Sequence, residues 1–250
     1  LEQEFMKAAA VGTPIAAFVV EPVQGEAGAV VPPADYLPRA RELCTRYGAL
    51  LIADAVATGF GRTGRMFACE HEAISPDILC LAKGITGGYL PLAATLTTEE
   101  VFNAFLGEYE EKKTFFHGHS YTGNPLACAA AVANLKVMKE EGILERSQPK
   151  IQFLSEALKG YRELEHVGDT RQIGMMVGIE LVVDKTTKEE YPFEDRIGIR
   201  VIKEARKRGL ILRPLGNVIV LMPPLGTSPD QLREILSTTY HSIKTVTEHG

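Results

Sequence analysis

The first part of the chain alternates continuous apolar runs with amphipathic stretches. The apolar runs at 15–20, 49–54 and 77–83 predict buried strands, and a fourth strand is expected at 92–98. Residues 36–48 have the spacing of an amphipathic helix closed by glycine. Because the strand runs do not alternate with polar residues, they indicate a mostly parallel sheet covered on both faces. The pattern predicts an α/β fold.

Two more helices are expected in this region, and the pattern changes near Gly142. The helices are placed at 99–106 and at 124–142, and Asn124 is a good N-cap for the second, which is rich in alanine. Beyond Gly142 the expected order is a helix at 144–159, strands at 167–174 and 175–183, a helix at 194–208, short strands around 210–214 and 217–223, and a helix from 229. We therefore expect a first domain over 1–142 and a smaller α+β domain over 143–250.

Polar side chains follow three of the expected strands. Glu21, Gln24 and Glu26 come after the first, Asp54 ends the second and Lys83 ends the third. Parallel strands bring their carboxyl ends to one edge of a sheet, where ligands of α/β proteins bind. Because an unpaired charge at a buried strand end is costly, each of these groups is expected to have a partner.

Lys83 allows two interpretations. It is either a solvated charge at the end of a strand, or a desolvated amine with a lowered pKa that acts as a nucleophile. A Walker phosphate loop is excluded, because that motif needs glycine directly before the lysine and Ser or Thr directly after it. Here Ala82 precedes Lys83 and Gly84 follows it.

Two segments could bind anions. The glycine-rich stretch 54–64 contains Arg62, which could hold an anion, although the stretch could equally be an ordinary surface loop. The segment 115–125 precedes a helix N-terminus, where backbone N–H groups and Ser120 could bind a phosphate, or it could be an ordinary capped loop.

Composition narrows the classes of function. The chain has 250 residues, 45% hydrophobic and 24% charged, and a net charge of −5, as in ordinary globular proteins and unlike proteins that bind nucleic acid. No apolar run approaches the roughly 18 residues of a membrane span, so no membrane partner is expected. The four cysteines form no C-x-x-C pair, and His117 and His119 lack a third ligand with metal-site spacing. We expect a cytoplasmic protein without a metal.

The polar groups together match the needs of one cofactor. A lysine that can bond to an aldehyde, an aspartate that can keep a pyridine nitrogen protonated and a loop that can hold phosphate are the requirements of pyridoxal 5′-phosphate (PLP). The stretches "LLIADAVATGFGRTG" and "LAKGITGG", with Lys83 placed 29 residues after Asp54, resemble the class III aminotransferases of PLP fold type I. The resemblance implies that 1–142 is the C-terminal part of a PLP-binding large domain whose N-terminal part is missing before Leu1.

The resemblance assigns roles to individual residues. Lys83 would bond to the cofactor and later carry a proton, and Asp54 would pair with the pyridine nitrogen. Val56 would pack on the ring, while His119 and Ser120 would reach the phosphate, by family habit from the partner subunit of a homodimer.

Three further residues would contact the substrate. The resemblance implies that Gly118 lines the substrate site, that Arg213 meets the substrate carboxylate and that Arg62 shapes the same pocket.

The sequence also departs from the family. Ala55 stands where glutamate is usual, and its effect on activity is open. Glu26 resembles the gate glutamate of ornithine- and GABA-type relatives, but Val220 replaces the arginine that those relatives pair with it. A dual-substrate gate is therefore not expected to operate in the same way.

Three stretches resemble the branch of this family that serves biotin biosynthesis: residues 57–100, "TFFHGHSYTGNPLACA" and "LRPLGNVIVLMPPL". Ala57 agrees with this branch, because many relatives with other substrates carry glutamine there. The implied reaction converts 7-keto-8-aminopelargonate to 7,8-diaminopelargonate, with S-adenosylmethionine or lysine as the amino donor. Another class III transaminase acting on an ω-amino acid or diamine, and a non-catalytic truncated subunit, remain as alternatives.

Overall fold

The computed structural model describes residues 1–248, which form two compact units. The first unit consists of Leu1–Pro22, Pro32–Phe60 and Phe67–Glu141, and the second begins its main part at Gly142. Two short segments from the first part of the sequence, Val23–Val31 and Gly61–Met66, also belong to the second unit. The change of pattern near Gly142 thus coincides with one boundary, while the two segments had no sequence signal that assigned them to the second unit.

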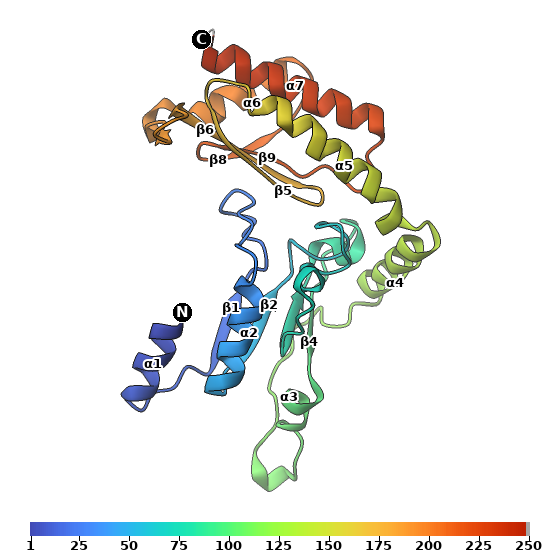
Figure 1. The fold of residues 1–250 in the computed structure, drawn as a ribbon. Helices are drawn as coiled ribbons and strands as arrows, with labels where there is room; N and C mark the ends of the chain where they lie inside the picture. Colours follow the sequence, from blue (N-terminus) through green and yellow to red (C-terminus); the bar gives the residue numbers. More distant parts are fainter. Residues whose placement is uncertain (249–250) are drawn as a thin grey trace. The chain divides into compact units, whose positions relative to one another are not determined.

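The first unit is built on a four-stranded sheet with the order β1-β2-β3-β4 (Figure 1). The strands are β1 (Ala17–Val20), β2 (Leu50–Asp54), β3 (Ile78–Leu81) and β4 (Ala94–Thr97). β1, β2 and β3 are parallel, whereas β4 runs antiparallel to β3. The prediction of a mostly parallel sheet is confirmed, with the fourth strand reversed at one edge.

The helices of the first unit include those expected at 36–48, 99–106 and 124–142. They are α1 (Glu2–Ala10), α2 (Tyr36–Tyr47), α3 (Glu99–Asn103) and α4 (Pro125–Glu140), with short 3₁₀ turns η1 (Ala68–Glu72), η2 (Lys83–Thr86) and η3 (Tyr109–Glu111). α2 ends because Gly48 adopts the left-handed conformation, with φ of 67°. α4 begins at Asn124, whose Oδ1 accepts hydrogen bonds from the amides of Leu126 and Ala127.

The two faces of this sheet differ in coverage. One face packs on α1 and α2 in a cluster of buried residues: Phe5, Val20, Leu37, Leu43, Cys44, Ala49 and Leu51. The opposite face carries Val19, Ile52 and Ile78 side by side, and Val19 is 62% exposed. The expectation that both faces are covered is therefore not met within residues 1–248, where Ile52 and Ile78 are half-buried.

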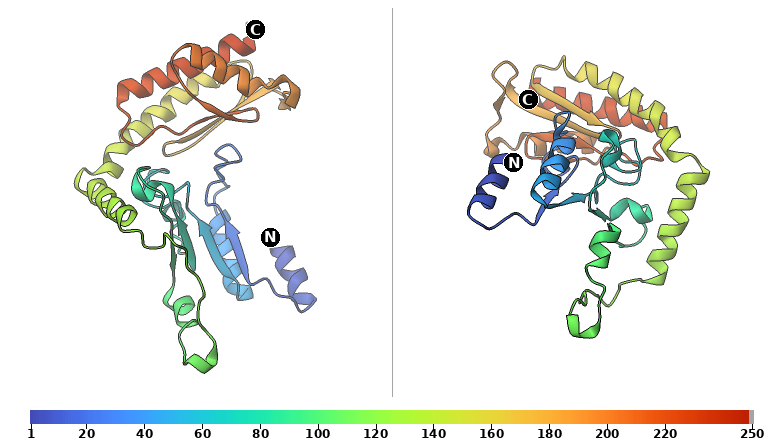
Figure 2. Two further views of the ribbon diagram at one scale, coloured as in Figure 1. Left: turned by 180° about the vertical axis from the view of Figure 1, so that it is seen from behind. Right: turned by 60° about the horizontal axis from the view of Figure 1, so that its bottom comes forward.

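The second unit is an α+β sandwich in which helices lie on one face of an antiparallel sheet (Figure 2). The strands, in the order β5-β6-β9-β8, are β5 (Val167–Ile173), β6 (Met176–Asp184), β9 (Val218–Leu221) and β8 (Arg213–Leu215), and β7 (Glu189–Glu190) pairs with β6. The helices are α5 (Ile143–Tyr161), α6 (Ile197–Lys207) and α7 (Pro229–Glu248), with a 3₁₀ turn η4 (Phe193–Asp195).

The core of the second unit lies between the sheet and these helices. Val177, Ile179 and Leu181 alternate along β6, and all three are fully buried against side chains of α5, α6 and α7. The hydroxyl of Tyr161 donates a hydrogen bond to the carbonyl oxygen of Leu236, which satisfies a polar atom buried in this core. The alternation in β6 is the period of a strand with one face in the core.

The opposite face of this sheet holds the segment Val23–Val31. Met176 forms a small buried cluster with Val23 and Ala29. Gly178 lets the backbone come close, because a Cβ atom there would lie 2.3 Å from the carbonyl oxygen of Gly28. Both faces of β6 are thus occupied, one by the helices and the other by a segment that follows β1.

The segment Gly61–Met66 is fixed at the turn between β5 and β6. The amide of Met175 donates to the carbonyl oxygen of Arg62 at 2.9 Å. Gly174 adopts φ of 58°, and a Cβ atom there would lie 2.2 Å from the carbonyl carbon of Thr63. The absence of a side chain at Gly174 is therefore what allows the two backbones to touch.

Gly174→Ala is expected to destabilise the protein by at least about 2 kcal/mol, because the added methyl group meets backbone atoms that cannot move aside easily. Gly209→Ala is the matched control: Gly209 also has positive φ, at 85°, but a Cβ atom there meets nothing within 4 Å. The control should lose about 1 kcal/mol from the backbone conformation alone. Urea unfolding measures both, and equal losses would contradict the proposed contact.

None of the helices within residues 1–248 is long and apolar enough to cross a membrane.

Candidate active site

Asp54 and Cys80 lie side by side at the carboxyl ends of β2 and β3. The register of the two parallel strands pairs their Cα atoms, so both side chains point to the same, less covered face of the sheet. The amide of Val56 donates to Oδ1 of Asp54 at 3.0 Å. Within residues 1–248 this is the one hydrogen bond to the Asp54 carboxylate, so Oδ2 can accept a bond from a ligand.

Lys83 is the first residue of the 3₁₀ turn η2, which follows β3 directly. Its φ is 47°, a left-handed conformation that costs a non-glycine residue about 1 to 3 kcal/mol. Such a conformation persists only where the surrounding structure holds it, and it is frequent at functional sites. The Lys83 side chain is exposed in this chain, so burial alone does not distinguish its two interpretations here.

The turn that contains Lys83 is packed closely on its inner side. Thr86 is almost fully buried, and its hydroxyl donates to the carbonyl oxygen of Leu90 at 2.6 Å. A Cβ atom at Gly84 would lie 3.0 Å from Cβ of Phe60. These contacts fix the backbone after Lys83, while its amine remains accessible.

Cys80 is a neighbour of Asp54 that the sequence analysis did not single out. Burial raises the pKa of the Cys80 thiol, and the negative charge of Asp54 raises this pKa further. The thiol is therefore a neutral neighbour of the carboxylate near pH 7. Alignment of the two predicted strand ends would have placed Asp54 beside Lys83, so the sequence carried no clear signal for Cys80.

Ala55 directly follows β2 at the candidate site. It is fully buried, and its amide donates to the carbonyl oxygen of Cys80 at 2.9 Å. A glutamate in this environment would have to bury its carboxylate, so the small residue fits the structure described here.

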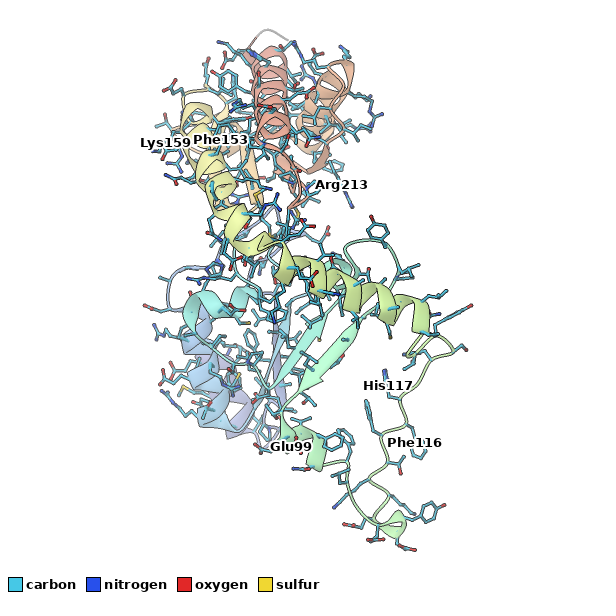
Figure 3. The ribbon with its side chains drawn as sticks, turned by 90° about the vertical axis from the view of Figure 1, so that its right-hand side faces the viewer. Glu99, Phe116, His117, Phe153, Lys159 and Arg213 are labelled. Atoms are coloured by element: carbon cyan, nitrogen blue, oxygen red, sulfur yellow. The ribbon has the colours of Figure 1, made fainter. Side chains whose placement is uncertain are left out.

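His117, Gly118, His119 and Ser120 are exposed on a long arm between α3 and α4 (Figure 3). The arm starts from the far edge of the sheet, because β4 is antiparallel and pairs Thr97 with Ile78 at the beginning of β3. His119 and Ser120 make no hydrogen bond or ion pair with Asp54 or Lys83 in the part of the chain that is described.

Aromatic rings line this arm. The ring of Phe115 lies between those of Phe105 and His117, with centroids 4.8 and 5.2 Å away, and the ring of His119 meets His117 edge-on at 4.9 Å. The rings thus hold the two histidines in fixed relation to Phe105. No group of three or more His, Cys, Asp and Glu residues that could hold a metal ion is found among residues 1–248.

Arg62 belongs to the second unit. Its guanidinium donates to the carbonyl oxygen of Pro223 at 2.6 Å, and burial lowers its pKa. Within residues 1–248 no carboxylate forms an ion pair with Arg62, so its charge is available to an anionic ligand.

Arg213 also belongs to the second unit, where it begins the edge strand β8 (Figure 3). Its side chain is exposed, and in the antiparallel register its partner is Val220. Glu26 lies in the segment Val23–Val31 of the same unit and is exposed. The structure thus groups Asp54 and Lys83 in one unit and the three other charged candidates in the second.

Comparison with known proteins identifies the family. The family profile described as aminotransferase class III matches residues 2–243. The chain belongs to the class III aminotransferases. These enzymes depend on PLP, which agrees with the lysine and aspartate at adjacent strand ends.

Relatives in this family show the same likeness along nearly the whole chain. The adenosylmethionine-8-amino-7-oxononanoate aminotransferases of Nitratidesulfovibrio vulgaris and Geobacter sulfurreducens are 56% and 55% identical to it, over 96% and 93% of this chain and 44% and 52% of their own lengths. The crystal structure of the enzyme with this name from Methanocaldococcus jannaschii has a TM-score of 0.93 at 45% identity, covering 98% of this chain and 57% of that one.

These matches confirm the predicted PLP fold type I architecture. The chain spans about half the length of the curated relatives that it matches.

The neighbourhood of Asp54 and Cys80 can be tested through the thiol. In Asp54→Asn the negative charge that opposes the thiolate is removed, so the pKa of Cys80 should fall and its alkylation at a fixed pH near 8 should become faster. Peptide mass spectrometry after timed alkylation reads each cysteine separately. Cys69, which is buried elsewhere, is the internal control and should keep its rate. An unchanged rate at Cys80 would contradict the pairing.

Proposed function

We propose that this chain carries part of the active site of a PLP-dependent aminotransferase of biotin biosynthesis. One observation carries the proposal: Asp54 ends β2 and Lys83 follows β3, the parallel strand beside it, at the same edge of the sheet and in the same compact unit. The close relatives named as adenosylmethionine-8-amino-7-oxononanoate aminotransferases support the choice of pathway.

The residues at this edge suit PLP. The free Oδ2 of Asp54 can accept a bond from a protonated ring nitrogen, and the exposed amine of Lys83 can reach an aldehyde. When bound, PLP supplies an electron-withdrawing ring that stabilises negative charge at the substrate carbon. The contribution of Asp54 is to keep the ring nitrogen protonated, that of Val56 is to pack against the ring, and that of Lys83 is to hold the cofactor and carry a proton.

The substrate would be held by groups outside this pair. We assign the carboxylate of 7-keto-8-aminopelargonate to Arg213, whose planar guanidinium can donate two parallel hydrogen bonds. Arg62, half-buried and without a carboxylate partner in the described chain, would shape the same pocket, and Gly118 would leave room for the substrate. The amino donor would be S-adenosylmethionine or lysine.

A homodimer with shared active sites would complete the phosphate site. His119 and Ser120 are exposed on an arm that starts from the opposite edge of the sheet from Lys83. By the resemblance to the family, they would serve the partner subunit. The four cysteines are free, which suits the reducing cytoplasm.

A second candidate is a class III transaminase with another ω-amino substrate. A probable GABA transaminase of Oryza sativa is 36% identical over 94% of this chain, and Glu26 resembles the gate glutamate of such enzymes. Val220 in place of the arginine that would pair with Glu26 favours the biotin reaction. A panel of keto acids and amines would separate the two functions, and absence of any transfer would indicate a non-catalytic subunit.

Lys83→Ala is expected to remove the visible absorption of the PLP-loaded native protein and to lower turnover by several orders of magnitude, because the nucleophile is lost. Lys112→Ala is the matched control, since Lys112 is also an exposed lysine with positive φ, at 54°. The control should keep both properties. A Lys83→Ala protein with an unchanged rate of amino transfer would exclude this role.

Arg213→Lys is expected to raise the KM for 7-keto-8-aminopelargonate about tenfold, because an ammonium group cannot copy the two parallel hydrogen bonds. The KM for a methyl ester of the substrate should differ little between the two proteins. Arg208→Lys, at an exposed arginine paired with Glu204, is the control. If the variant still prefers the acid over the ester as strongly as the parent does, Arg213 does not bind the carboxylate.

A further inference from the structure

A side chain from the middle of α4 contacts the turn that carries Lys83. Nδ2 of Asn134 donates to the carbonyl oxygens of Gly84, at 2.9 Å, and Ile85, at 3.1 Å. These two bonds use both hydrogens of the amide nitrogen. The opposite orientation would place the Asn134 oxygen against two carbonyl oxygens, so the contacts fix which way the side chain points.

Asn134 and the turn are in close contact. A Cβ atom at Gly87 would lie 2.9 Å from Oδ1 of Asn134, and φ of Gly87 is 62°. On its other side the turn meets Phe60, 3.0 Å from where a Cβ of Gly84 would be. The four residues of η2 are thus confined between the ring of Phe60 and the amide of Asn134.

Asparagine is unfavourable in the interior of a helix unless its side chain makes compensating hydrogen bonds. Its helix propensity is well below that of alanine, the residue that dominates the first half of α4. Asn134 is half-buried, and leaving its amide unsatisfied there would be costly. The two bonds to η2 satisfy this amide, and they couple α4 to the turn that begins at Lys83.

We propose that Asn134 is a positioning residue for Lys83: it holds η2 so that Lys83 keeps its left-handed backbone and directs its amine correctly. This inference rests on the proposed function of Lys83. Lys83 is the residue whose conformation is intrinsically unfavourable, and the two carbonyl groups that Asn134 binds belong to the next two residues. Without Asn134 the turn is expected to relax, and the amine to sample positions unsuited to the reaction.

The experiment compares Asn134→Leu, which keeps the size of the side chain and removes both bonds, with Met138→Ala. Met138 is a buried residue one turn further along α4 whose Sδ lies 3.9 Å from Nδ2 of Asn134, so its truncation weakens the packing around Asn134 without removing a bond to η2. Thermal unfolding establishes that both variants of the native protein are folded. Each variant is then measured without PLP and with PLP.

Without PLP, hydrogen exchange is followed at the amides of Ile85, Gly87 and Tyr89, each of which bonds within this turn and the residues around it. Losing two bonds to the turn should make these amides exchange about 5- to 30-fold faster in Asn134→Leu and leave them nearly unchanged in Met138→Ala. Unchanged exchange in Asn134→Leu would overturn the proposal, because Asn134 would then not hold the turn.

With PLP, Asn134→Leu should lower kcat by about 10- to 100-fold, as expected for a small misplacement of a reacting group, with a much smaller change in KM. The pH at which the visible absorption band changes should also shift, which loss of packing alone would not cause. Faster exchange together with the parental kcat and the parental pH profile would overturn positioning. If the parent protein itself shows no band and no transfer, the proposed function fails, and the exchange data still decide whether Asn134 holds the turn.

Discussion

The parallel register of β2 and β3 is the constraint on which the candidate site depends. It places Asp54 beside Cys80, so that the residues following β3 emerge at the same edge as the carboxylate. A slip of one residue would turn Asp54 to the face covered by α2, where a charge would be buried among apolar side chains. Leu51 and Ala53 alternate with Asp54 along β2 and are buried on the covered face. Their burial prevents that slip. Hydrophobic burial on the covered face of the sheet therefore determines which polar side chains lie together at its carboxyl edge.

The second requirement is a strained backbone directly after β3. Lys83 has positive φ without being glycine, and the turn that it begins is closely packed: a Cβ atom would lie 3.0 Å from Phe60 at Gly84 and 2.9 Å from Asn134 at Gly87. Strain of this kind is stable only if contacts elsewhere compensate for it. Burial of Thr86 and the bonds from Asn134 supply such contacts from two directions. The backbone that follows Lys83 is thus held by residues outside the Asp54–Lys83 pair.

Apolar runs and helical spacing predicted nearly every strand and helix, because these patterns are local. The antiparallel direction of β4 could also have been predicted from the sequence. The 12 residues between Leu81 and Ala94 contain no helical pattern long enough for a parallel crossover. The bonds from Asn134 and the close contacts at Gly174 and Gly178 could not be predicted from the sequence. They depend on residues 49 or more positions apart in the sequence, and the contacts at Gly174 and Gly178 depend on the absence of a side chain.

The segments after β1 and β2 belong to the second unit, although the strands before them belong to the first. Asp54 belongs to the first unit, yet Arg62, eight residues later, belongs to the second. The backbone of Arg62 is bound to Met175 and its guanidinium to Pro223, so its position follows from the β5–β6 turn and the residues after β9 rather than from β2. Asp54 and Arg62 are thus anchored in different cores. Substitutions in the second core can therefore displace Arg62 while leaving the contacts around Asp54 and Lys83 in place.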